Sequence, residues 1–391
     1  MYCLGSVMLN SLEIKNFRSL EDFQVKKLGR INLIVGKNNS GKSSVLEALR
    51  IYAGNANKGL LEKIAQGHDE KCFVESSDQE SFNGVLPFED LFTGRKFPVG
   101  EVPIVIGELG NEEEALKIYH VYRVEREVSV NDEDGKFIEK SVRQVSVTEL
   151  AKVNKSQIVG EGLLILKKGN TVLIDFKHSH PSFTRFVLDG ITVPSSFIPT
   201  QLIAMNDLAK DWDAIALTEA EEMVKAAMQI ILPEFESLIF VNDSVYADTT
   251  GKETRRVAKV KIKGLSRPVP LNSLGDGMLR ILQMVLKVFP AKGEFLLIDE
   301  FENGLHYSVQ EKVWTLLFEL AEKLDIQVFA TTHSWDCIES FSKVAMDKKS
   351  IEGVLFRVGQ SVRNSDKGRV IATVFDEQQL YNITQADVEV R

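Results

Sequence analysis

Consecutive residues from Gly36 to Ser43 have the types and spacing of a phosphate-binding loop. They fit G-x-x-x-x-G-K-[ST], in which backbone N–H groups surround phosphates, Lys42 reaches the terminal phosphates and the Ser43 hydroxyl ligates Mg²⁺. The apolar run 31–35 predicts a buried strand before the loop, and residues 44–53 predict a helix whose N-terminus faces the anion. A glycine-rich turn with a stray lysine is the alternative, but it explains neither flanking element. The residues expected to contact a nucleotide here are Gly36, Asn38, Asn39, Ser40, Gly41, Lys42, Ser43 and Ser44.

Two adjacent carboxylates, Asp299 and Glu300, follow the apolar run Phe295 to Ile298. The run predicts a buried strand, whose end would place Asp299 to hold Mg²⁺ opposite Ser43, directly or through water. Glu300 points to a different face, and we expect it to orient or deprotonate an attacking water. An acidic pair at a strand end is also common in solvated turns. The phosphate loop in the same chain favours the catalytic interpretation.

A serine and two glycines, Ser273, Gly275 and Gly277, open an apolar helix predicted from Met278 to Phe289. Glycines permit close backbone approach and a helix N-terminus carries partial positive charge, so this run predicts a second anion site. The chain then has two helix-start anion sites but one lysine-bearing loop. We therefore expect the second site to bind the nucleotide held by another copy of the chain. The alternative is an ordinary helix start capped by Ser273 or Asp276.

A further apolar run beginning at Ile326 ends in a histidine, His333. Beside a terminal phosphate, an imidazole can sense the phosphate by hydrogen bonding and position a water. A single histidine after a strand is a weak signal alone. Its place one predicted helix (His306 to Leu324) after the carboxylate strand strengthens it. Lys42, Glu300 and His333 are thus the candidate catalytic residues.

Lys42 and Asp299 must meet around one metal ion, although most of the chain separates them. The sequence therefore predicts an α/β fold in which both ends of the chain form one head. Its mixed sheet carries helices on both faces and ligands at the carboxyl ends of the strands. The long insertion is β-rich from 102 to 196. The strands expected are Leu12–Phe17, Val102–Ile106, Tyr119–Glu125, Gly162–Leu166, Thr171–Phe176 and Arg255–Ile262.

The insertion also contains a predicted helix from Asp207 to Ile231 with an apolar stripe at three- and four-residue steps. Such a stripe outside the head could lack a partner within the chain, so we expect it to support self-association or contact with another protein. The predicted domains are an N-terminal lobe with the phosphate loop and β-rich subdomain (1–205), a short helical arm (206–250) and a C-terminal lobe (251–391).

The composition, with 44% hydrophobic and 26% charged residues among 391, is that of an ordinary globular protein. The net charge of −9 argues against coating nucleic acid with the whole surface. A local patch stays open: Lys259, Lys261 and Lys263 alternate along one strand, as a phosphate-tracking face or merely a solvated one. No apolar run could span a membrane and no secretory signal is recognisable. Three scattered cysteines favour a reducing cytoplasm.

The order of phosphate loop, Ser-x-Gly-x-Gly, Asp-Glu strand and histidine resembles the ABC-type ATPase head of SMC-like proteins. More narrowly it resembles the RecF and OLD-type ATPases, on the stretches Leu12 to Leu20, Asp299 to His306 and Val388 to Arg391. The resemblance implies ATP and Mg²⁺ as ligands, with Lys42 and Ser43 on phosphate and metal and His333 as the switch. It also implies that Arg18 lies near the nucleotide and that the signature Ser273, Gly275 and Gly277 acts in trans. Here the signature reads Ser-Leu-Gly-Asp-Gly rather than Ser-Gly-Gly, and Gln201 is one candidate for the Q-loop residue.

Many ATPases of this kind belong to bacterial anti-phage systems and pair with a nuclease or another effector. OLD nucleases append a Toprim-type metal domain, whereas this sequence ends about sixty residues after His333 without an acidic cluster. We expect the two clusters His178–His180 and His68–Glu70 to be solvated surface rather than metal sites. The expectation is a homodimer or higher homo-oligomer that regulates a separate effector. The alternatives are a RecF-like repair ATPase that contacts DNA directly and a non-hydrolysing scaffold.

Overall fold

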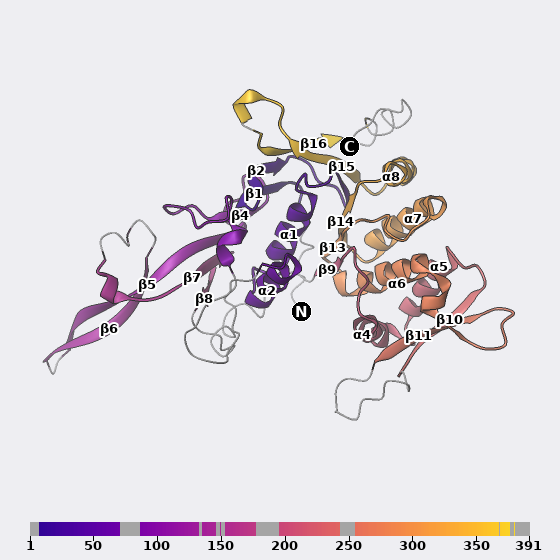
Figure 1. Cartoon of the computed structure of the whole chain (residues 1–391), viewed down its shortest axis with the longest axis horizontal. Helices are drawn as coiled ribbons and strands as arrows, with labels where there is room; N and C mark the ends of the chain where they lie inside the picture. Colours follow the sequence, from indigo (N-terminus) through magenta and orange to yellow (C-terminus); the bar gives the residue numbers. More distant parts are fainter. Residues whose placement is uncertain are drawn as a thin grey trace.

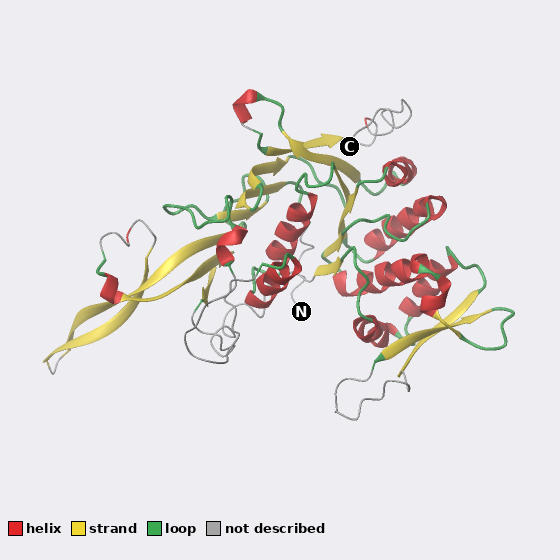
Figure 2. Cartoon of the chain, viewed as in Figure 1, coloured by secondary structure: helices red, strands yellow, loops and turns green. Residues whose placement is uncertain are grey.

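The strand before the phosphate loop lies inside a six-stranded sheet of order β16-β15-β3-β14-β13-β9. Neighbouring strands are parallel except for the antiparallel pair β15–β16. The computed structural model (Figures 1 and 2) describes residues 8–70, 87–132, 135–145, 149, 153–176, 195–242, 255–366, 368–375 and 379. The strands are β3 (Ile31–Val35), β9 (Ser195–Ile198), β13 (Phe295–Ile298), β14 (Gln327–Thr332), β15 (Gly353–Gln360) and β16 (Val370–Phe375).

This central sheet is buried on both faces, as its nearly continuous apolar strands require. In β3, Ile31 and Leu33 face one hydrophobic core and Ile34 faces the other. In β13, Leu296 and Leu297 are divided in the same way. The parallel arrangement brings the carboxyl ends of β3, β14, β13 and β9 to one edge. That edge carries the phosphate loop, His333 and the two carboxylates, so both ends of the chain form one head.

A second, antiparallel sheet of seven strands covers one face together with α1 (Figure 1). Its strand β4 pairs with β1, so the β-rich part of the insertion continues the N-terminal sheet of the head. The hairpin partner β6 was missed from the sequence. The elements are β1 (Leu12–Phe17), β2 (Leu20–Val25), β4 (Ile104–Gly107), β5 (Leu116–Asp132), β6 (Gly135–Val145), β7 (Ile158–Lys167) and β8 (Asn170–Asp175), with α1 (Lys42–Ala53), α2 (Lys58–Gly67), η1 (Phe88–Leu91) and η2 (Lys155–Gln157).

Helices from the second half of the chain cover the other face. A small sheet of order β10-β11-β12 flanks them (Figure 1). Helices therefore lie on both faces of a mixed α/β head, which confirms the predicted fold class. The elements are α4 (Met205–Ile215), α5 (Glu219–Gln229), α6 (Asp276–Val288), α7 (Tyr307–Lys323), α8 (Trp335–Asp347), β10 (Phe235–Asn242), β11 (Arg256–Ile262), β12 (Val269–Pro270), η5 (Leu271–Leu274), η6 (Phe289–Ala291) and η7 (Asn364–Asp366).

The single helix predicted from Asp207 to Ile231 is wrong, because the chain forms α4 and α5 with a break between them. Leu217, in the break, has φ +63°, a value that helices of L-residues do not accommodate. The apolar stripe is also not without a partner: Met223 and Ile230 pack on the core that contains α6. This part of the 206–250 interval is therefore core rather than a free association surface. Residues from all three predicted domains share that core.

The last turn of α1 is fixed to the second sheet by a buried lysine. Lys167 of β7 donates from Nζ to the Tyr52 carbonyl oxygen at 2.6 Å and lies 3.7 Å from the Tyr52 ring centre. Burial lowers the pKa of Lys167 to about 7, and it raises the pKa of the nearby Glu294 to about 7. The C-terminal end of the phosphate-loop helix is thus held by a strand of the insertion.

Several expectations concern other parts of the molecule. No helix within the described ranges is long and apolar enough to cross a membrane. Cys337 is buried and free, while Cys3 and Cys72 lie outside the described residues, as do His178 to His180 and Val388 to Arg391.

Candidate functional site

The phosphate loop has a backbone that its glycines make possible. Gly36, directly after β3, has φ +154°, and a Cβ there would lie 2.3 Å from the Val358 carbonyl oxygen. Gly41 has φ +105° and is the N-cap of α1, with no side chain bonded to the first N–H groups of the helix. Those N–H groups therefore remain available to an anion at the mouth of the loop.

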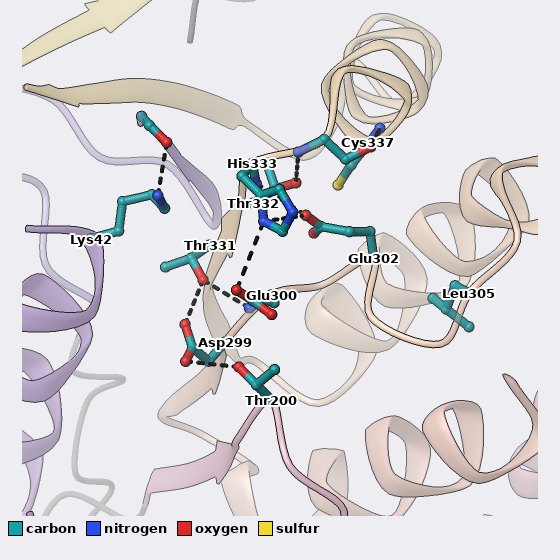
Figure 3. Close-up of polar contacts among 12 residues, drawn as sticks. Lys42, Thr200, Asp299, Glu300, Glu302, Leu305, Thr331, Thr332, His333 and Cys337 are labelled. Atoms are coloured by element: carbon teal, nitrogen blue, oxygen red, sulfur yellow. Dashed lines mark hydrogen bonds and ion pairs between the residues drawn. The ribbon is translucent and has the colours of Figure 1, made fainter. Parts of the chain in front are cut away.

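Lys42 is held over the loop by its own backbone. Its Nζ donates to the carbonyl oxygens of Gly36 at 2.8 Å and Lys37 at 2.9 Å. Burial lowers the pKa of Lys42, while Asp299 and two further carboxylates act in the opposite direction from across the site (Figure 3). The buried Ser40 Oγ has no hydrogen-bond partner among the described residues. Phosphate oxygens would satisfy both the hydroxyl and the ammonium, so the loop fits a nucleotide.

The Asp299 carboxylate is fixed by two threonines, one in β14 and one two residues after the end of β9, the strands on either side of β13 (Figure 3). Its Oδ1 accepts from Thr331 Oγ1 at 2.7 Å, and its Oδ2 accepts from Thr200 Oγ1 at 3.1 Å. Thr331 Oγ1 also accepts the Glu300 N–H at 2.8 Å. Sequence reasoning missed both threonines. The available signal for Thr331 was a hydroxyl at the end of a strand that is otherwise apolar.

Glu300, Glu302 and His333 form one group at the strand ends (Figure 3). Glu300 has φ +47°, which turns the chain sharply after Asp299. His333 Nδ1 lies 3.8 Å from Glu300 Oε1 and 3.1 Å from Glu302 Oε1. The structure thus brings the predicted carboxylate and histidine together, and it adds Glu302, which sequence reasoning did not single out.

The oxygen donors here suit Mg²⁺, which prefers carboxylate, hydroxyl, water and phosphate oxygens. Asp299 is oriented by hydrogen bonds, and Ser43 is exposed in the first turn of α1. Within the described ranges, no three or more His, Cys, Asp or Glu residues cluster as a metal site. Mg²⁺ at phosphate sites needs only one or two protein carboxylates, because phosphates and waters complete its shell. Ser43 and Asp299 are therefore the residues that fit it.

The signature turn (Leu271–Gly277) leads into α6. Gly275, with φ +91°, is the N-cap, and no side chain caps the helix. The Ser273 hydroxyl instead donates to the Pro270 carbonyl oxygen at 2.6 Å. The alternative of a side-chain cap by Ser273 or Asp276 is therefore wrong. A Cβ on Gly277 would lie 3.1 Å from the Gly304 carbonyl oxygen, so this glycine serves packing, while Gly275 and Ser273 are exposed.

Arg280 of α6 is a second residue that sequence reasoning missed. Its guanidinium donates at 2.7 Å to each of the carbonyl oxygens of Pro199, Asp299 and Glu300. The side chain is only 2% exposed, and burial lowers its pKa to about 10. The signature helix is thereby bonded to the carboxylate strand of its own chain. A lone arginine in an apolar helix was the available signal.

Arg18 lies in the turn between β1 and β2, near the phosphate loop. A Cβ on Gly41 would lie 3.4 Å from Oγ of the neighbouring Ser19. The Arg18 guanidinium donates to both oxygens of Glu70, at 2.8 and 3.1 Å, and lies 2.9 Å from Glu47 of α1. Burial lowers the pKa of Arg18, but the nearby carboxylates raise it by more, so the pKa of Arg18 is raised overall. In this structure the arginine is engaged by protein carboxylates.

Three weaker candidates have local contacts. His68 and Asp69 are exposed, as expected for the 68–70 cluster, whereas Glu70 is only 7% exposed and His68 bonds Glu47, so the expectation is wrong for Glu70. Lys261 pairs with Glu236 at 2.8 Å, while Lys259 and Lys263 are exposed on the same strand region. Gln201 is exposed directly after Thr200, at the end of the strand beside β13.

Comparisons with known proteins agree with this geometry. Residues 8–184, which include the phosphate loop, match the family described as AAA ATPase domain. Residues 229–336, which include the carboxylates and His333, match the family described as AAA domain, putative AbiEii toxin, Type IV TA system. A Helicobacter pylori protein named ATP/GTP phosphatase is 24% identical over 358 residues, covering 87% of this chain and 89% of that protein. This chain is an ATPase, and two parts of it match AAA-type domain families.

Two further similarities are to a RecF protein and to a solved SMC head. The DNA replication and repair protein RecF of Proteus mirabilis is 22% identical to the ATPase over 379 residues, covering 83% of this chain and 92% of RecF. A solved SMC head bound to the C-winged helix domain of ScpA is 14% identical, with a TM-score of 0.47, covering 94% of this chain and 97% of that one.

Proposed function

We propose that this ATPase is a Mg²⁺-dependent switch that dimerises head to head around two ATP molecules. Hydrolysis separates the heads, and the two states control a separate effector. The observation that carries the proposal is the pair of uncapped helix starts, α1 and α6, of which only α1 has a lysine-bearing loop. A second copy of the chain would bring its α6 start to the nucleotide held at α1.

The side chains divide the chemistry between them. Lys42 and the α1 N–H groups bind the terminal phosphates, and Ser43 with Asp299 would hold Mg²⁺, which would neutralise developing charge. Glu300 orients and deprotonates the attacking water, and His333 contacts the terminal phosphate. Ser273 and the N–H groups after Gly275 of the second chain complete the charge stabilisation.

Dimerisation and turnover test this proposal together. We expect Glu300→Gln to form an ATP-dependent dimer, measured by light scattering after size exclusion, and to release almost no phosphate. Wild-type protein should form the dimer transiently, and EDTA should abolish turnover. A protein that stays monomeric at saturating ATP and Mg²⁺ in both forms would contradict the proposal. Stable assembly with ATP and no phosphate release from wild type would instead support a scaffold.

We further propose that the effector is a nuclease or toxin and that the system acts in anti-phage defence in a cytoplasm. The family described as putative AbiEii toxin, Type IV TA system supports this class of role. Affinity purification from the native host with mass spectrometry of co-purifying chains tests it. A reproducible partner that carries a nuclease or toxin domain is expected. Recovery of DNA-repair proteins alone would contradict it.

A direct role on DNA is the second candidate, favoured by the exposed Lys259 and Lys263 and by the relative named RecF. This hypothesis predicts that duplex DNA stimulates ATP turnover and that the double variant Lys259→Glu, Lys263→Glu loses the stimulation. A rate that DNA leaves unchanged would exclude it.

A further inference from the structure

Glu302 binds His333 through two groups at once. Its Oε1 lies 3.1 Å from the imidazole Nδ1 and accepts the backbone N–H of His333 at 3.0 Å. The Glu302 side chain is 11% exposed, whereas that of His333 is 50% exposed. A nearly buried carboxylate therefore holds both the backbone and the ring of an exposed histidine (Figure 3).

The position of Glu302 is set by the turn after the carboxylate strand. The N–H of Phe301 donates to the Thr331 carbonyl oxygen at 2.9 Å, and the Phe301 ring stacks on Trp314 at 3.8 Å. The Glu302 carbonyl oxygen accepts the Leu305 N–H at 2.9 Å. These contacts fix the backbone on both sides of Glu302. The carboxylate is therefore oriented before any ligand binds.

This contact bears on which nitrogen of the ring carries a proton. An ionised carboxylate only accepts hydrogen bonds, so its place beside Nδ1 favours the tautomer with the proton on Nδ1, in which Nε2 is the acceptor nitrogen. Glu300 lies farther from Nδ1, at 3.8 Å. Because Glu302 lies closer to Nδ1 than Glu300 does, Glu300 keeps its oxygens for a water.

We infer that Glu302 is a positioning residue that fixes the tautomer and direction of His333 for phosphate contact and leaves Glu300 to act on water. The inference rests on the proposed ATP hydrolysis at this site. Residues that orient a metal-binding histidine through its second nitrogen typically change affinity or activity by about 10- to 100-fold when replaced, and we expect an effect of the same order here.

Two variants distinguish a role of Glu302 in orienting His333 from a role only in stabilising the fold. Glu302→Gln keeps an oxygen that can accept from Nδ1, and Glu302→Ala removes it. We expect kcat to fall by about 10-fold for Gln and about 100-fold for Ala, with ATP affinity within about twofold of wild type. The exposed Glu311 on α7 supplies the control, since Glu311→Gln should leave kcat unchanged. Thermal unfolding midpoints identify any variant that loses its fold.

The imidazole itself supplies a readout that needs no ATP. In ¹⁵N-histidine-labelled protein, with the His333 signals assigned by His333→Ala, we expect the wild type to show protonated Nδ1 and Glu302→Ala to shift toward protonated Nε2. A folded Glu302→Ala variant with wild-type kcat and unchanged nitrogen shifts would overturn the inference. Wild-type protein without phosphate release would contradict the proposed function, and the nitrogen shifts would still decide whether Glu302 holds Nδ1.

Discussion

The helices α1 and α6 begin alike but in different surroundings. Each follows a glycine with positive φ, +105° at Gly41 and +91° at Gly275, and neither has a side-chain cap. A Cβ on Gly41 would lie within 3.5 Å of side chains from the β1–β2 turn, β2 and β16, whereas a Cβ on Gly275 would meet nothing within 4 Å in the described part of the chain. One anion-binding helix start is enclosed by its own chain, and the other is open.

The basic side chains of the two helices, Lys42 and Arg280, also point in different directions. Lys42 of α1 is held at the mouth of its own loop, but Arg280 of α6 points inward to the carbonyl oxygens around the carboxylate strand. The α6 start can therefore offer N–H groups and the Ser273 hydroxyl to a nucleotide, but not the Arg280 guanidinium, and its first residue is the acidic Asp276. The proposed function requires α1 of one chain and α6 of another for a complete site. Arg280 also connects α6 to the backbone of Glu300 in the same chain, because it donates to the Glu300 carbonyl oxygen.

Replacing the carboxylate that acts on water should have the largest effect. Glu300→Gln should lower kcat by about 100- to 10,000-fold and leave ATP binding intact, because the carboxylate acts on water and not on the phosphates. Single-turnover phosphate release and nucleotide affinity measure the two parts. Normal turnover of Glu300→Gln would exclude Glu300 as the base.

Lys42→Ala tests binding at α1. The loss of a charged donor to phosphate should weaken ATP binding by about 100-fold, and hydrolysis should be lost with it. Titration with a fluorescent ATP analogue measures the affinity. The exposed Lys63 of α2 supplies the control, and Lys63→Ala should bind ATP as wild type does. Equal ATP affinities of Lys42→Ala and Lys63→Ala would contradict the assignment of the loop at α1 as the ATP-binding site.

Ser273→Arg tests the open site. A bulky side chain there should remove the contacts of the turn with the nucleotide held by a second chain, so hydrolysis should fall at least about 10-fold while ATP affinity stays within about threefold of wild type. Phosphate release and ATP titration measure this on the same preparation. A parallel loss of binding would mean that Ser273 contacts nucleotide in its own chain.

The smallest expected effect concerns the backbone of the signature turn. Gly275 has φ +91° and ψ +166°, a region open almost only to glycine, so Gly275→Ala should destabilise the fold by about 1–3 kcal/mol. Gly67, the last residue of α2, has open space around it, and Gly67→Ala should be neutral or slightly stabilising. Urea unfolding of both variants measures the difference. A Gly275→Ala variant as stable as wild type would contradict the required conformation.

Functional residues are predicted best from the sequence where they are contiguous in it. The loop 36–43 and the Asp299–Glu300 pair were identified because strand, turn and helix signals are contiguous there. Thr200, Thr331 and Arg280 were missed because their contacts depend on strand order and on helix packing, which no local pattern encodes. The strand β9 is only four residues long and gave no periodicity. The break at Leu217 falls within a stripe that is compatible with one continuous helix.

The central claim, that each active site combines α1 of one chain with α6 of another, is tested most directly by mixing Lys42→Ala with Ser273→Arg, each inactive alone. A mixed dimer contains one intact Lys42 loop facing one intact Ser273 turn. Random exchange makes half of the dimers mixed, with one of two sites active, so about a quarter of wild-type phosphate release should return. No recovery, despite mixed dimers demonstrated with two affinity tags, would contradict the claim and assign Ser273 to its own chain.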